Sequence, residues 1–133
     1  MTMRSPLLLA AALFAVSAVA HAAGDHIGRT ALVVDTGTEV QEVFAPDTSK
    51  IVLHIELKGA EVGAKVKGTW IAVKTDVAPA NYKIDEIVLT LDSTLDEAEV
   101  SLSKPDAGWP VGTYQVEVSY NGTVEKTVPF SVK

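Results

Sequence analysis

GWPVGTYQVEVSYNGTVEKTVPFSVK, residues 108–133, is the stretch that decides the fold. Two alternating runs flank Asn121-Gly122, a dipeptide that readily adopts the positive φ angles of a type I′ turn. The larger apolar side chains of the first run fall on one face of a strand, and its polar side chains fall on the other. The stretch therefore predicts a β-hairpin with one buried face.

The chain before this hairpin shows the same short-strand pattern. In residues 50–58, Ile51, Leu53, Ile55 and Leu57 alternate with more polar positions, which predicts a strand with one buried side. In residues 64–74, Trp70 shares a face with small and apolar residues and is the expected core anchor. Further strands are expected at 30–35, 39–44, 84–91 and 98–103, and residues 77–83 are expected to be irregular. Seven to eight strands separated by Gly, Pro and Asp turns predict an all-β antiparallel sandwich or small barrel.

The N-terminal segment has the features of a signal peptide. Arg4 supplies the positive charge, residues 7–16 form the core of the apolar stretch, and Ala20-His21-Ala22 is a small-x-small cleavage site. We therefore expect a signal peptide at 1–22, a single mature domain at 23–133, and a periplasmic or secreted protein with no membrane attachment. An uncleaved anchor is the alternative, but the apolar run is shorter than the roughly 20 residues that a spanning helix needs.

Composition excludes several function classes. The sequence has no cysteine, which rules out disulfides, thiol nucleophiles and zinc ribbons. Removing residues 1–22 takes away Arg4 and no acidic residue, so the formal charge changes from −6 to −7. An acidic chain with scattered lysines is a poor partner for nucleic acid or an anionic membrane.

These patterns resemble the small exported bacterial domains with an immunoglobulin-like or fibronectin III-like β-sandwich. Trp70 matches strand C, residues 112–118 match strand F, and the turn at Asn121-Gly122 leads into a matching strand G. Tyr114 occupies the place of a tyrosine corner, in which the hydroxyl bonds back to nearby backbone. The resemblance implies an immunoglobulin-like sandwich over 23–133. Because such sandwiches serve as adhesins, chaperones, carbohydrate-binding modules and inhibitors, it implies no single activity.

A weaker resemblance links the chain to CopC-type periplasmic copper proteins. It rests on Gly112-Thr113-Tyr114 and Phe130-Ser131-Val132, but the histidine ligands that the family uses at its mature N-terminus and near its end are missing. His26, in a segment expected to be a frayed leader, and His54, expected to face solvent, are the only candidate metal ligands of the mature chain. Two donors are fewer than a site usually needs, so we expect no bound metal or other cofactor, and a CopC-type metal carrier stays an alternative.

No catalytic constellation is visible. Carboxylate pairs occur at Asp85/Glu86, Asp92/Asp96 and Glu97/Glu99, but adjacent or turn carboxylates of an acidic domain are usually solvated. The sequence has no Gly-x-Ser-x-Gly nucleophile elbow and no phosphate-binding loop. We expect no enzyme, with a small hydrolase or an enzyme inhibitor as the alternative.

Two aromatic clusters are candidates for recognition. Trp109 adjoins Pro110 before the closing hairpin, and Tyr82 lies near Pro79 in the irregular segment. Exposed loop aromatics bind proteins or sugars, but for Trp109 we favour packing over the sandwich end, because a tryptophan is more often buried than exposed. Strands at 39–44 and 124–132 are expected edges that can pair with another chain, with Pro129 blunting the second. The sequence therefore predicts a non-enzymatic exported binding module with a protein or carbohydrate partner.

Overall fold

The predicted closing hairpin is present in the computed structural model, which describes residues 26–94 and 96–133. Strands β7 (Gly112–Tyr120) and β8 (Thr123–Val132) pair antiparallel. The turn residues Asn121 and Gly122 have φ angles of 49° and 90°. Both values are positive, as a type I′ turn requires, so the turn prediction is confirmed.

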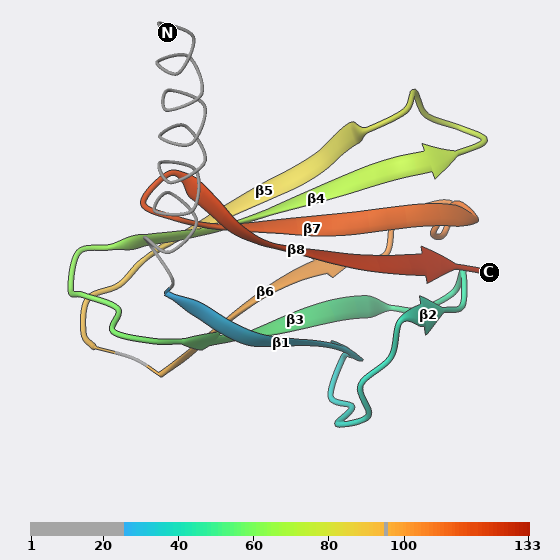
Figure 1. The fold of residues 1–133 in the computed structure, drawn as a ribbon. Helices are drawn as coiled ribbons and strands as arrows, with labels where there is room; N and C mark the ends of the chain where they lie inside the picture. Colours follow the sequence, from blue (N-terminus) through green and yellow to red (C-terminus); the bar gives the residue numbers. More distant parts are fainter. Residues whose placement is uncertain (1–25, 95) are drawn as a thin grey trace, which may run out of the picture.

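Eight strands form two packed sheets (Figure 1). The five-stranded sheet has the order β2-β8-β7-β4-β5, and the three-stranded sheet has the order β1-β3-β6. The remaining bounds are β1 (Ile27–Val34), β2 (Val43–Phe44), β3 (Lys50–Leu57), β4 (Lys65–Thr75), β5 (Tyr82–Thr90) and β6 (Glu97–Ser103). The all-β sandwich with eight strands is therefore confirmed.

Several strand predictions need correction. Of the expected strand at 39–44 only Val43–Phe44 forms β2, and β5 begins at Tyr82, inside the segment 77–83 that was expected to be irregular. The pair β2–β8 is parallel, so the sandwich is not antiparallel throughout. It also joins the end of the 39–44 segment to the end of the 124–132 segment, the two edges expected to be open to other chains. In addition, β1 begins at Ile27 rather than Thr30. A bulge at Gly28 and Arg29 interrupts the alternation of side chains, so the sequence pattern did not show that the strand starts earlier.

The core lies between the sheets and contains the side chains that the alternation placed there. Trp70 and the inward residues of β3 are almost fully buried, as is the apolar face of β7. Gly68 lets the sheets approach, because a Cβ there would lie 2.8 Å from Cγ2 of Val100 on the opposite sheet. The inner-face predictions for β3, β4 and β7 are confirmed.

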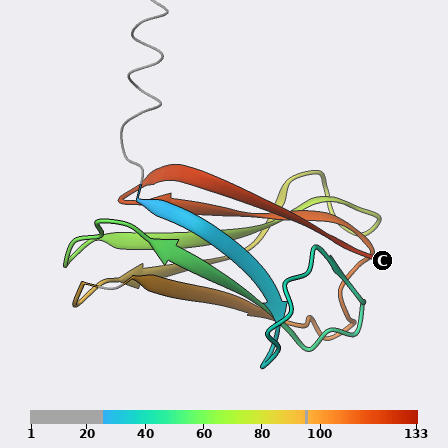
Figure 2. The same ribbon diagram turned by 60° about the horizontal axis from the view of Figure 1, so that its bottom comes forward.

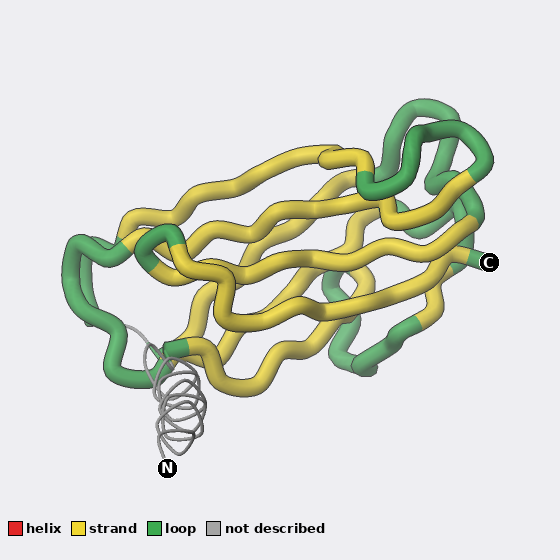
Figure 3. The backbone as a smooth tube through the Cα atoms, turned by 45° about the horizontal axis from the view of Figure 1, so that its top comes forward, coloured by secondary structure: helices red, strands yellow, loops and turns green. Residues whose placement is uncertain are grey.

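The loops gather at the two ends of the sandwich (Figure 3). One end carries the loops 35–42, 45–49, 76–81 and 104–111, and the other carries 58–64 and the 121–122 turn. Along the sides, β1 contacts β8, which leaves β5 and β6 as the sheet edges of the opposite side (Figure 2).

The predicted signal peptide at 1–22 lies outside the described residues. Within 26–94 and 96–133, no helix is long and apolar enough to cross a membrane.

Candidate functional site

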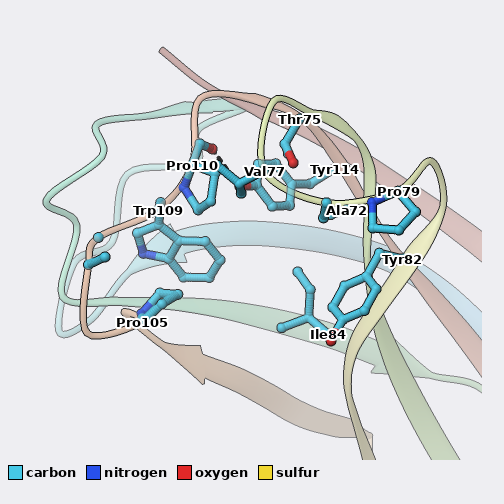
Figure 4. Close-up of a pocket in the computed structure, with 13 residues that line it drawn as sticks. Ala72, Thr75, Val77, Pro79, Tyr82, Ile84, Pro105, Trp109, Pro110 and Tyr114 are labelled. Carbon is cyan, nitrogen blue, oxygen red and sulfur yellow. Dashed lines mark hydrogen bonds between the residues drawn. The ribbon is translucent and has the colours of Figure 1, made fainter.

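An apolar pocket opens at the end of the sandwich that carries loops 76–81 and 104–111 (Figure 4). Its volume is about 420 Å³, within the range of small-ligand sites. The two predicted aromatic clusters form opposite walls: Trp109 lies on one side and Tyr82 with Pro79 on the other. The pocket is lined by Ala72, Thr75, Val77, Ala78, Pro79, Tyr82, Ile84, Pro105, Ala107, Gly108, Trp109, Pro110 and Tyr114.

Trp109 is a structural wall of this pocket. Its side chain is 2% exposed, and its Nε1 donates to the carbonyl of Thr48 at 2.8 Å. Its backbone N–H donates to the carbonyl of Pro46 at 2.9 Å. Trp109 therefore ties loop 45–49 to loop 104–111, and the packing interpretation of this residue is confirmed.

Tyr82 differs from Trp109 because it is 50% exposed. It starts β5 directly after Asn81, whose φ of 56° closes the turn and whose N–H donates to the carbonyl of Val73 at 3.0 Å. Neighbouring Val77 is 73% exposed at the pocket mouth. A large, accessible aromatic beside an apolar hollow is the part of this end suited to contact a partner.

Tyr114 forms the predicted tyrosine corner at the back of the pocket. Its hydroxyl donates to the carbonyl of Pro110, four residues upstream, and its ring stacks on Phe130 with centroids 5.1 Å apart. Burial raises the pKa of the Tyr114 hydroxyl above its ordinary value of 10.0. The corner fixes the loop that supplies Trp109 to the pocket.

Replacing Tyr114 with phenylalanine is expected to lower the unfolding free energy by about 1–2 kcal/mol at neutral pH, because the Pro110 carbonyl loses its donor. A tyrosine whose pKa is raised on folding contributes stability that is complete below the unfolded value near 10 and is lost as the pH rises through the folded value. Denaturant unfolding between pH 7 and 11 should therefore show a fall above pH 10 that is smaller in Tyr114→Phe. An equal fall in both proteins would contradict this role.

The pocket offers little polar chemistry. The hydroxyl of Thr75 is buried without a hydrogen-bond partner among the described residues. The other lining side chains are apolar except for the two tyrosines, and none is a carboxylate, histidine or lysine. This arrangement suits the burial of an apolar group, and it lacks an acid–base pair.

Comparison with known proteins identifies the type of fold. No protein-family model matches the sequence, and no curated protein matches it either. Among solved structures, the immunoglobulin-like protein PA1606 of Pseudomonas aeruginosa is similar, with a TM-score of 0.56 over 81% of this chain and 94% of that chain. The chain has an immunoglobulin-like fold. At 12% sequence identity this likeness carries the fold of the immunoglobulin-like domain and no activity.

His26 is not frayed in this immunoglobulin-like domain. Its ring stacks on Tyr120 with centroids 3.9 Å apart, and its Nδ1 lies 3.1 Å from Oε2 of Glu125. Oε1 of Glu125 also accepts the backbone N–H groups of His26 at 2.6 Å and Ile27 at 3.0 Å. The leader prediction was wrong because these contacts join positions almost one hundred residues apart, which no local pattern reveals.

His54 is half-buried on β3, and its Nδ1 lies 3.4 Å from Oε2 of Glu99 on β6. The two candidate metal ligands therefore face different glutamates. Among residues 26–94 and 96–133, no group of three or more His, Cys, Asp or Glu side chains could hold a metal ion.

The carboxylate pairs lie on the surface. Asp85 and Glu86 are both exposed on β5, where Glu86 Oε1 accepts from Nζ of Lys83 at 3.1 Å. Asp92 and Asp96 are exposed beside the β5–β6 turn. None of the paired carboxylates lines the pocket.

Sequence reasoning missed Glu125 and the meeting of the two aromatic clusters. Glu125 is the extra residue of a β8 bulge between the pairs Val118–Lys126 and Ser119–Val124, which redirects its side chain. The meeting of the clusters could have been found, because loops separated by two strands of alternating direction return to the same end of a sandwich.

Proposed function

We propose that this chain is an exported binding module without enzymatic activity, and that the end pocket receives an apolar side chain of a protein partner. The observation that carries the proposal is the convergence of Tyr82 and Trp109 on one apolar pocket. Tyr82 is accessible while Trp109 gives a fixed wall, so the site combines a contact residue with a rigid support.

A protein partner fits this pocket better than a carbohydrate. Sugar sites need several side chains that donate to or accept from hydroxyl groups. In this lining the Thr75 hydroxyl is buried and the Tyr114 hydroxyl already donates to Pro110, which leaves only the hydroxyl of the half-exposed Tyr82. A peptide ligand needs fewer polar contacts, since an apolar side chain fills the hollow.

Export is part of the proposal on the strength of the signal features at 1–22, which favour a periplasmic or secreted location. The absence of enzymatic activity is supported by the apolar lining. A metal carrier is the less favoured function, because His26 and His54 are held by separate glutamates.

The proposal can be tested with N-acetyl-leucine amide, N-acetyl-tryptophan amide and glucose as probes. Titration of the isotope-labelled protein is expected to shift the methyl resonances of Ala72, Ala78 and Ile84 with the blocked amino acids at millimolar concentration, and not with glucose. Tyr82→Ala should raise the Kd by about tenfold, the loss expected for an aromatic anchor.

Two further variants sharpen the test. Val124→Ala removes an equally exposed apolar side chain at the opposite end and should leave the Kd unchanged. Thr75→Val should leave the Kd unchanged without lowering stability, because the hydroxyl that it removes is buried and has no hydrogen-bond partner among the described residues. Shifts confined to other surfaces, or equal binding by wild type and Tyr82→Ala, would refute the pocket as the site; shifts with glucose alone would favour a carbohydrate.

A further inference from the structure

The four long edge strands of the sandwich are not equally protected against pairing with another chain. The edge of β1 has a bulge at Gly28 and Arg29, and that of β5 has a bulge at Ile84. The edge of β8 has Pro129 and the Glu125 bulge, and β2 covers its end. Bulges, prolines and covering segments are the common devices that block strand addition.

Among the described strands, β6 is the exception. Its seven residues pair with β3 from Lys50–Ser103 to Glu56–Glu97 without a register shift. The strand contains no proline, lysine or arginine. No strand within residues 26–94 and 96–133 pairs with its outer side, because β6 ends the order β1-β3-β6.

The direction of the β6 backbone groups follows from two hydrogen bonds. Leu57 N–H donates to the carbonyl of Asp96 at 2.8 Å, and Lys104 N–H donates to the carbonyl of Ser49 at 2.8 Å. In an antiparallel ladder the residues that bond to the partner alternate with those that point away from it. The residues with N–H and C=O groups directed toward the free side are therefore Glu97, Glu99, Ser101 and Ser103.

The side chains of this edge repel a second acidic strand. Glu97 lies directly opposite Glu56, and like charges in such cross-strand pairs are destabilising. Residues 82–104 contain six acidic residues and two lysines. A lysine or arginine on an added strand opposite Glu97 would relieve this repulsion. One opposite Glu99, whose Oε2 lies 3.4 Å from Nδ1 of His54, would add a second charge pair.

The inner side of the edge is apolar. Ala98 and Leu102 of β6 and Ile84, Ile87 and Leu89 of β5 are only partly buried, although all five pack against the core. They belong to the two edge strands on the side of the sandwich opposite β1 and β8. Apolar residues of an added strand that face inward would cover part of this surface.

We propose that the β6 edge accepts an extended protein segment in which basic residues alternate with apolar ones. The basic residues lie opposite Glu97 and Glu99 on the outer face, and the apolar residues lie opposite Ala98, Val100 and Leu102. A second copy of this chain is a poor occupant, because its own β6 would bring more glutamates to the same face. This surface goes beyond the proposed function, since none of the pocket-lining residues belongs to β6.

The test uses a capped peptide, Thr-Val-Lys-Val-Lys-Val-Thr, with the full mature domain. At saturating peptide, amide hydrogen exchange of Glu97, Glu99, Ser101 and Ser103 is expected to slow by at least tenfold. The Kd should rise with added salt, because the paired charges are near the surface. A peptide with glutamate in place of lysine should not protect these amides.

Two variants isolate the edge. Glu97→Lys/Glu99→Lys should raise the Kd for the lysine peptide at least tenfold and improve binding of the glutamate peptide. Ser101→Pro removes an N–H that points away from β3, so the ladder stays intact while strand addition is blocked. Protection at the β5 or β8 edge instead, no protection at millimolar peptide, or a dimer by sedimentation that β6 variants abolish would overturn the proposal. Tyr82→Ala leaves this binding unchanged, which separates it from the pocket.

Discussion

Replacing Trp109 with alanine is expected to lower the unfolding free energy by about 3–5 kcal/mol, the usual cost of truncating a buried tryptophan. The indole is 2% exposed and packs edge-on against Tyr114 and Phe130, with centroids 5.9 and 6.5 Å apart. Its loss also leaves the Thr48 carbonyl without the Nε1 donor. Urea unfolding followed by circular dichroism would measure the change.

Two controls define the cause. Val111→Ala, two residues away and 56% exposed, should change stability by less than about 0.5 kcal/mol. Trp109→Phe should recover part of the loss, because it restores ring packing but not the Nε1 hydrogen bond. A loss below about 1 kcal/mol for Trp109→Ala would mean that the residue does not join the loops as described. Because a destabilised variant complicates any binding assay, Tyr82 is the better position at which to test the proposed binding.

Replacing Gly112 with alanine is expected to lower the unfolding free energy by roughly 2–4 kcal/mol, combining backbone strain with overpacking. Gly112 has a φ of 155°, a conformation that L side chains rarely adopt. A Cβ there would overlap the carbonyl oxygen of Lys74 and lie 2.9 Å from Cγ2 of Thr75. The start of β7 would have to move away from the end of β4, which supplies Thr75 to the pocket.

Gly59→Ala is the matched control, because Gly59 also has a positive φ, of 59°, but has no atom within 4 Å of the added Cβ. Its cost should be about 1 kcal/mol, from conformation alone. Thermal unfolding of both variants gives the comparison. Equal losses in the two would show that the close approach to Lys74 contributes nothing.

Local sequence patterns were sufficient to predict most of the sheet structure. The Asn121-Gly122 turn, the inward side chains of β3 and the buried position of Trp70 each depend on residues near in sequence, where alternation and turn chemistry act directly. The tyrosine corner was also predictable, because Tyr114 and Pro110 are four residues apart.

Contacts between distant segments were not predictable in this way. His26 meets Tyr120 and Glu125 only after the sandwich closes, and the bulge that turns Glu125 toward it leaves no mark in the alternation. The two aromatic walls of the pocket also come from loops distant in sequence. Local patterns gave them as separate clusters, and only the alternating direction of the two strands between the loops indicates that they share an end.

Strand β7 runs from the end of the sandwich that carries the pocket to the end that carries His26. Gly112 lies beside Thr75 near the pocket, and Tyr120 lies against His26, so about 26 Å of strand stands between them at 3.3 Å per residue. A domain immobilised through the chain before His26 would point its pocket away from the support. A purification tag placed after Lys133, whose N–H donates to the Phe44 carbonyl, would instead emerge at the pocket end of the molecule.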